Sequence, residues 1–153
     1  MPGQAARILV VDDEQDILDL ITLYLEREHY IVHTAPCGEE AVRMAEECRP
    51  DLIVLDIMLG GMDGIEVCRA LRAGGCADVP ILFVSARCED PDIVTALAEG
   101  GDDYITKPFS PSQFVARVHA HLRRQRMLAR AKSGTDASEG VLAYPGLEID
   151  YRQ

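Results

Sequence analysis

Leu52-Ile53-Val54-Leu55-Asp56 is the stretch that decides the fold. It is a continuous apolar run, rich in β-branched residues, that ends on a single carboxylate. Such a run predicts a strand buried on both faces of a parallel sheet. Because an isolated carboxylate is costly to remove from water, we expect Asp56 to lie in a crevice at the end of this strand, facing a cation.

The rest of the chain alternates between strand and helix patterns. Four more strands are predicted, over Arg7–Asp13, Ile31–Thr34, Pro80–Ser85 and Asp103–Lys107. Apolar residues at helical spacing predict helices over Glu14–His29, Gly38–Arg49, Ile65–Leu71, Asp92–Glu99 and Ser112–Met127. In the fourth helix we expect Val94 and Leu97 to face the core. This alternation predicts an α/β fold in which parallel strands are joined by right-handed crossovers and helices cover both faces of the sheet.

Length and composition exclude several classes of protein. A chain of 153 residues holds one ordinary domain, and its net charge of -11 argues against non-specific nucleic-acid binding by the whole chain. No apolar run is long enough to span a bilayer and Met1–Ala6 does not resemble a signal peptide, so we expect a cytoplasmic protein without membrane contact. The cysteines are odd in number and form no C-x-x-C pair, which predicts reduced thiols: Cys37, Cys48, Cys68, Cys76 and Cys88.

The predicted strands end on residues that suit one chemistry: Asp12, Asp13, Asp56, Ser85 and Lys107. In a doubly wound sheet these ends meet, and three carboxylates in one crevice need cations to stay charged. One Mg²⁺ and a lysine ammonium would balance them. A hydroxyl and an ammonium also donate hydrogen bonds to phosphoryl oxygens. The set therefore predicts a phosphoryl site with Asp56 as the nucleophile.

Each of these residues also has a structural interpretation. Asp12-Asp13 could cap the following helix, Lys107 could be a solvated lysine, and Ser85 could be a hydroxyl in a turn. Tyr104 could simply pack against the sheet edge. His121 falls near the apolar face of the last helix, where a packed or interfacial histidine is favoured over a ligand or a pH switch.

Four motifs together resemble the receiver domain of two-component response regulators. They are Val10-Val11-Asp12-Asp13-Glu14, Leu55-Asp56-Ile57-Met58-Leu59 with Met62-Asp63-Gly64, Val84-Ser85-Ala86, and Gly101-Asp102-Asp103-Tyr104-Ile105-Thr106-Lys107-Pro108-Phe109. The resemblance covers Arg7 to Arg124. It implies a flavodoxin-like sheet of five parallel strands in the order 2-1-3-4-5, and a receiver domain over residues 1–124.

The resemblance also implies a chemistry. Asp56 would accept a phosphoryl group from a phosphohistidine of a sensor histidine kinase. Asp13 and Asp56 would bind Mg²⁺ directly, or Mn²⁺ in its place, together with the Met58 carbonyl, and Asp12 would act through water. The protein would not be an enzyme in the usual sense, but a phosphoacceptor that assists its own phosphorylation and dephosphorylation.

A conformational switch follows from the same family. Lys107, joined to Pro108 by a cis peptide bond, would pair with the phosphoryl oxygens. Ser85 would hydrogen-bond the phosphoryl group, and Tyr104 would turn inward as Ser85 moves. The change would reach the face made by the fourth helix, fifth strand and last helix.

A narrower resemblance is to the OmpR/PhoB subfamily, which dimerises through that face and carries a C-terminal winged-helix DNA-binding domain. It rests on Asp102-Asp103-Tyr104, Arg117 and Leu122-Arg123-Arg124. Asp102 or Asp103 would pair with Arg117 and Arg123 across a homodimer. Residues 125–140 would end the last helix and form a flexible linker, and residues 141–153 would open an incomplete winged-helix domain, so any DNA binding would belong to residues beyond this sequence.

Three positions depart from the family pattern. Ile93 and Gln113 replace a lysine and a glutamate that usually form an intersubunit ion pair, so we expect weaker dimerisation. Gly60 replaces a common proline and should loosen its loop.

Three other classes of protein were weighed. A haloacid dehalogenase-type phosphohydrolase needs an aspartate where Met58 stands, and a flavodoxin would have its FMN phosphate repelled by Asp12-Asp13-Glu14. A receiver-like binding module that works without phosphorylation stays open as the alternative function.

Overall fold

The computed structural model describes residues 5–87 and 89–134, with side chains described as far as Ala129. The chain divides into two compact units, Met1–Leu122 and Arg123–Gln153, and the sheet lies in the first. The strands are β1 (Arg7–Val11), β2 (Ile31–Ala35), β3 (Leu52–Leu55), β4 (Ile81–Ser85) and β5 (Asp103–Thr106). The helices are α1 (Gln15–Arg27), α2 (Gly38–Cys48), α3 (Gly64–Ala73), α4 (Asp90–Ala98) and α5 (Pro111–Gly134).

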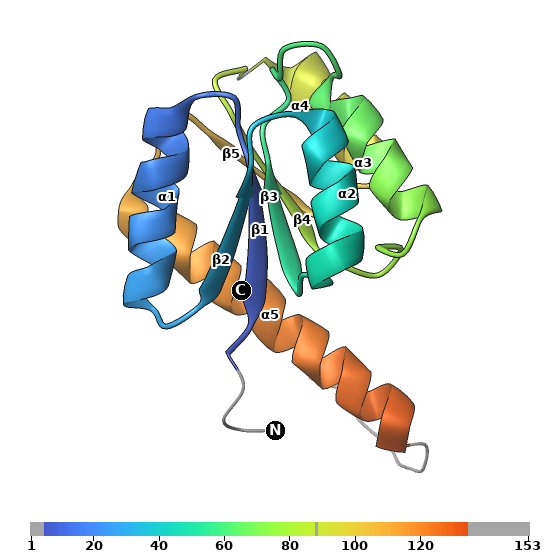
Figure 1. Cartoon of the computed structure of the whole chain (residues 1–153). Coiled ribbons are helices and arrows are strands. Elements are labelled where there is room, and N and C mark those ends of the chain that lie inside the picture. The colour runs from blue at the N-terminus through green and yellow to red at the C-terminus, as the bar shows by residue number, and fades with distance from the viewer. Residues whose placement is uncertain (1–4, 88, 135–153) are drawn as a thin grey trace. The chain divides into compact units, whose positions relative to one another are not determined.

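The sheet has the expected topology. Within the described residues, five parallel strands lie in the order β2-β1-β3-β4-β5, which confirms the predicted flavodoxin-like fold (Figure 1). β1 pairs with β2 on one side and with β3 on the other, so the strand order reverses between β1 and β3. In sheets of this kind the crevice outside the carboxyl ends at the reversal is where ligands bind.

Two apolar layers hold helices to the two faces of the sheet. α1 and α5 cover one face through Leu18, Ile21, Leu25, Phe114, Val118 and Leu122. α2, α3 and α4 cover the other face through Ala41, Ala45, Val67, Cys68, Leu71 and Ala96 (Figure 1). Every residue of β3 is buried, as its unbroken apolar sequence predicts.

The inward face of α4 differs from the prediction. Val94 is 64% exposed and Leu97 is 40% exposed, whereas Ala96 is fully buried, so the expectation that Val94 and Leu97 face the core was wrong. The physical reason is the closeness of the chain here. A Cβ at Gly101 would stand 2.6 Å from a Phe83 ring atom and 3.0 Å from the Ala96 carbonyl. Only small residues fit at this contact, and the larger ones turn outward.

The last helix runs further than the sequence suggested. α5 reaches Gly134, so Lys132–Gly134, which were expected to begin the linker, are helical. The remainder of the predicted linker, 135–140, and the predicted opening strands, 141–153, lie outside the described residues. No helix in the described part of the chain has the length and apolar character needed to cross a membrane.

The described cysteines are free thiols, as predicted. They are Cys37, Cys48, Cys68 and Cys76, whereas Cys88 lies outside the described residues. Burial raises the pKa of the Cys48, Cys68 and Cys76 thiols above the ordinary value. A raised pKa keeps a thiol protonated and unreactive near neutral pH.

Candidate functional site

An acidic crevice lies at the carboxyl ends of β1 and β3. Asp12 is 2% exposed and Asp56 is 4% exposed, while Asp13 faces solvent. One carboxylate oxygen from each of these three residues lies within 4.8 Å of the others. Residues separated by more than forty positions in the sequence therefore meet where the strand order reverses.

The backbone around Asp56 fixes its position. The Asp56 N–H donates to the Val11 carbonyl at 3.0 Å, and the Met58 N–H donates to Asp56 Oδ1 at 3.1 Å. α3 begins directly against this turn, because the Gly64 N–H donates to the Ile57 carbonyl at 2.8 Å. A Cβ at Gly64 would stand 2.1 Å from the Asp56 carbonyl oxygen, so only glycine fits there.

Lys107 brings a cation into the crevice from the end of β5. Its Nζ lies 2.9 Å from Asp12 Oδ2, 2.9 Å from Asp56 Oδ2 and 3.4 Å from Glu14 Oε1. The side chain is only 12% exposed. Burial alone would lower the pKa of Lys107, but hydrogen bonds to Asp12 and Asp56 outweigh it and raise that pKa above its ordinary value. The peptide bond from Lys107 to Pro108 is cis, as the resemblance implies.

The crevice carries more negative than positive charge. Burial raises the pKa of Asp12, although its hydrogen bond to Lys107 opposes the shift. Among the described residues one lysine faces Asp12, Asp13, Asp56 and the exposed Glu14. A set of carboxylate oxygens with unbalanced negative charge suits a hard divalent cation such as Mg²⁺. The contact of Glu14 with Lys107 was not predicted, although Glu14 follows the acidic pair directly.

The helix-cap alternative for Asp12-Asp13 does not describe what is seen. α1 is preceded by Glu14, whose side chain makes no capping hydrogen bond. Asp12 Oδ1 does accept the Glu14 N–H at 2.9 Å, while Asp12 Oδ2 accepts from Lys107. One carboxylate thus holds both the turn and the lysine.

Ser85 and Tyr104 are linked at the edge of the crevice. Ser85 is buried, and its Oγ accepts the Arg87 N–H at 3.3 Å. The Tyr104 hydroxyl donates to the Arg87 carbonyl at 2.6 Å and is within hydrogen-bonding reach of the Ser85 side chain. Burial raises the pKa of Tyr104, against the lowering effect of Ser85. The two residues expected to act as a switch therefore share one segment, the turn after β4.

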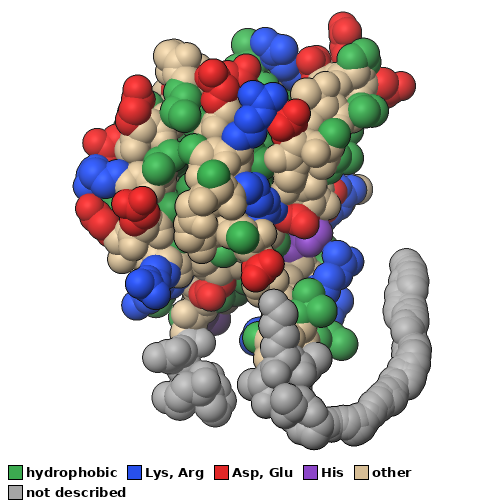
Figure 2. All heavy atoms as spheres, turned by 90° about the vertical axis from the view of Figure 1, so that its right-hand side faces the viewer, with side chains coloured by type: hydrophobic (Ala, Val, Ile, Leu, Met, Phe, Trp, Pro, Cys, Tyr) green, Lys and Arg blue, Asp and Glu red, His purple; other side chains and the backbone are tan. Residues whose placement is uncertain are grey.

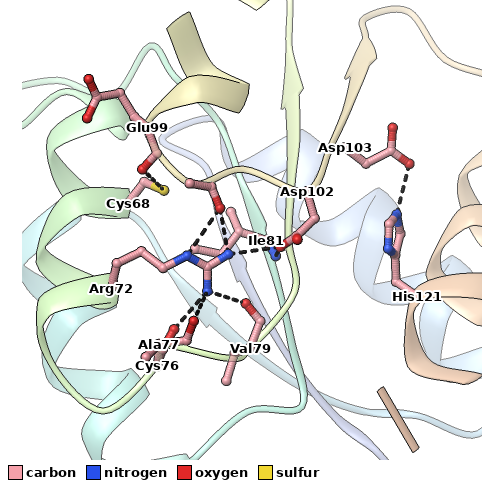
Figure 3. Close-up of polar contacts among 11 residues, drawn as sticks. Cys68, Arg72, Cys76, Ala77, Val79, Ile81, Glu99, Asp102, Asp103 and His121 are labelled. Carbon is pink, nitrogen blue, oxygen red and sulfur yellow. Dashed lines mark hydrogen bonds and ion pairs between the residues drawn. The ribbon is translucent and has the colours of Figure 1, made fainter. Parts of the chain in front are cut away.

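The two neighbouring aspartates of the expected dimer face have different partners within the chain. Asp102 Oδ2 accepts from Arg72 Nη2 and from the Ile81 N–H, both at 2.9 Å. Asp103 contacts Arg117 at 2.9 Å and His121 at 3.0 Å on the side of α5 (Figure 3). Successive strand residues point to opposite faces of the sheet, which explains the division. Arg123, the fourth residue expected on this face, is exposed and begins the second unit.

Arg72 forms a second charge cluster that the sequence did not reveal. Its guanidinium donates to Asp102 and to the carbonyls of Gly100, Cys76, Ala77 and Val79. Figure 3 shows these acceptors surrounding the guanidinium. The end of α3 is thus joined to the α3–β4 and α4–β5 connections. Most of its acceptors are backbone carbonyls, which leave no signal in a sequence.

Comparison with known families agrees with this architecture. The response regulator receiver domain matches residues 8–119, which is more than half of the chain. This chain therefore belongs to the receiver domain family of two-component response regulators.

Curated relatives support the narrower resemblance. The chain is 49% identical over 144 residues to the alkaline phosphatase synthesis transcriptional regulatory protein PhoP of Bacillus subtilis, covering 94% of this chain and 60% of the relative. It is 46% identical over 150 residues to the DNA-binding response regulator MtrA of Mycolicibacterium smegmatis, covering 98% of this chain and 61% of the relative. These are OmpR/PhoB-type regulators. The chain spans about 60% of the length of the relatives it matches.

Solved structures show the same fold. The BeF3-activated N-terminal receiver domain of Klebsiella pneumoniae RstA has a TM-score of 0.73 and 35% sequence identity, covering 76% of this chain and 98% of that one. A response regulator from Chloroflexus aurantiacus has a TM-score of 0.76 and 31% identity, covering 79% of this chain and 100% of that one.

Proposed function

We propose that Asp56 accepts a phosphoryl group from a phosphohistidine of a sensor histidine kinase. One observation carries the proposal. Carboxylate oxygens of Asp12, Asp13 and Asp56 lie within 4.8 Å of one another, and the Lys107 ammonium lies 2.9 Å from two of these residues. Family membership of the chain supports the same chemistry.

In the transfer step an Asp56 oxygen attacks phosphorus and forms an acyl phosphate. The bond from phosphorus to the imidazole nitrogen of the kinase breaks, and its electron pair returns to that imidazole. Lys107, already beside Asp56, donates hydrogen bonds to the phosphoryl oxygens. Buried Ser85 offers a hydroxyl donor from the neighbouring strand.

The same residues would hold a divalent cation. Asp13 and Asp56 would bind Mg²⁺ or Mn²⁺ directly with the Met58 carbonyl, and Asp12 would act through a water molecule. The all-oxygen donor set and the excess negative charge of the crevice fit such an ion. When bound, the ion would supply positive charge to the transferring phosphoryl group.

Phosphorylation would change the turn after β4. A phosphoryl group on Asp56 would draw the Ser85 hydroxyl toward it. Because Arg87 is bonded to both Ser85 and Tyr104, movement of Ser85 would shift the Tyr104 side chain and the start of α4. The face made by α4, β5 and α5 would report the change.

This face would pair weakly with a second copy of the chain. Val94 and Leu97 are exposed on α4 and offer apolar contact. Asp102 and Asp103, by contrast, already bind Arg72, Arg117 and His121 within the chain. An intersubunit pair would have to displace these contacts, and Ile93 and Gln113 supply none. We therefore propose a homodimer in which Asp102, Asp103, Arg117 and Arg123 contribute little.

Control of transcription would belong to a longer protein. The relatives are named as transcriptional or DNA-binding regulators, and this chain covers about 60% of their length. On the face shown in Figure 2, acidic and basic side chains are interspersed. Such a surface does not favour a polyanion, so we assign DNA binding to a winged-helix effector region that residues 141–153 would begin.

Intact-protein mass after incubation with acetyl phosphate tests the proposal. Wild type should gain one phosphoryl group in the presence of Mg²⁺, with little gain in its absence, and Asp56→Ala should gain none. If folded wild type gained none under any condition, the chain would be a binding module that works without phosphorylation.

A further inference from the structure

Three residues from separate parts of the sequence meet at the end of the sheet opposite the acidic crevice. Glu28 follows α1, Tyr30 precedes β2, and His119 lies on α5. His119 Nε2 lies 3.1 Å from Glu28 Oε1, and the Tyr30 hydroxyl contacts His119 Nδ1. The Tyr30 and His119 rings have centroids 5.5 Å apart at an angle of 51°. The order of groups is therefore carboxylate, imidazole, phenol.

The backbone holds Glu28 and Tyr30 in place. α1 ends at Arg27, and His29 adopts a positive φ of 68°, which turns the chain sharply into β2. The Tyr30 N–H donates to the Leu25 carbonyl at 3.2 Å, while the Ile31 N–H donates to the Ala6 carbonyl at 2.9 Å. α5 is fixed by the buried residues on either side of His119, including Val118. The geometry is thus set by the fold.

The contacts of His119 determine its protonation. A carboxylate only accepts hydrogen bonds, so Nε2 carries a proton and donates it to Glu28. In the neutral ring Nδ1 then has a free lone pair and accepts the Tyr30 hydroxyl. A carboxylate that orients an imidazole, which in turn accepts a proton from a hydroxyl, is the arrangement that activates nucleophiles.

We propose that Tyr30 is a nucleophilic modification site that takes an acyl group from small acyl donors of the acyl phosphate class. The Tyr30 oxygen attacks the carbonyl carbon and forms an ester, and its proton passes to His119 Nδ1. The carbon–oxygen bond to phosphate breaks, and inorganic phosphate leaves with the electron pair. Glu28 stabilises the resulting imidazolium until it returns its proton to water. Asp56, by comparison, attacks phosphorus, so the two reactions are independent.

The test compares two tyrosines in one molecule. Full-length protein is incubated with acetyl phosphate, and peptide masses give the acetylation rates of Tyr30 and Tyr24, which are both partly buried. Because a positioned general base contributes at least about a hundredfold, Tyr30 should react at least tenfold faster than Tyr24. His119→Gln should reduce the Tyr30 rate to that of Tyr24, and Glu28→Gln should reduce it severalfold.

Matched controls separate activation from exposure and folding. His121→Gln removes the other histidine of α5 and should leave the Tyr30 rate unchanged, as should Asp56→Ala. Circular dichroism would establish that each variant folds, and Glu28→Gln, a conservative change at an exposed site, keeps the test open if His119→Gln does not fold. Equal rates for Tyr30 and Tyr24 in wild type, or no loss of rate in a folded His119→Gln or Glu28→Gln variant, would overturn the proposal.

Discussion

Two clusters in this molecule each surround one cation, but they are balanced differently. The Lys107 ammonium contacts Asp12, Asp56 and Glu14, with Asp13 in the same crevice. The Arg72 guanidinium contacts one carboxylate, Asp102, and otherwise neutral carbonyls. The first cluster has a large excess of negative charge. The second is neutral, and its donors are satisfied.

The difference shows how function and scaffold can be told apart in one chain. Like charges brought together in a buried place oppose folding unless a ligand completes them. A guanidinium whose donors are all used within the chain leaves nothing for a ligand to complete, and it stabilises the segments that it joins. We therefore assign chemistry to the Lys107 crevice and support to the Arg72 cluster.

Removing the Arg72 cluster should have the largest effect on stability. Arg72→Ala leaves Asp102 and four carbonyls without their donor, which should lower the free energy of unfolding by about 3 kcal/mol. Urea denaturation measures this loss, and Asp56 phosphorylation should persist in the folded variant. Arg69→Ala is the matched control, since Arg69 also joins α3 to the end of α4 but through an exposed ion pair with Glu99. It should change stability little.

Magnesium should act on the other cluster alone. At a hundred times its Kd, an ion that binds only the folded state raises the free energy of unfolding by about 2.7 kcal/mol. Wild type and Arg72→Ala should gain equally, because the clusters share no partner. Asp13→Asn should gain much less. An equal gain in Asp13→Asn would show that the ion does not bind at this crevice.

The Asp103 contacts should make a smaller, pH-dependent contribution. Burial alone would raise the pKa of Asp103, but hydrogen bonds from His121 and the Tyr104 N–H, with the nearby Arg117 charge, hold that pKa below its usual value. The stabilisation is therefore present above the unfolded pKa of about 4 and is lost as pH falls through the lower folded value. Asp103→Asn should cost about 1 kcal/mol at pH 7. A cost that stayed constant down to pH 2 would contradict this account.

The sequence predicted the sheet and most of the crevice for the same reason. Apolar runs mark buried strands, and parallel strands bring their carboxyl ends together, so Asp12, Asp56 and Lys107 could be grouped without a structure. The alternation of strand residues could also have separated Asp102 from Asp103, which the sequence analysis placed on one face.

Other features have no local signal in the sequence. Ala96 is buried in place of Val94 because of a close approach to the sheet that depends on tertiary packing. Arg72 uses mainly backbone carbonyls as acceptors. His119 meets Glu28 across 91 positions. None of these contacts follows from periodicity or spacing, because each depends on how separate elements pack.

The most direct test is the unfolding free energy of Asp56→Asn in magnesium-free buffer, measured beside its phosphorylation. The amide keeps the shape of the carboxylate but removes one buried charge and its repulsion with Asp12 and Asp13, at the loss of one contact with Lys107. We expect stability to rise by about 1 kcal/mol and phosphorylation to disappear. A variant that was less stable than wild type, or one that still took up a phosphoryl group, would contradict the assignment of this crevice.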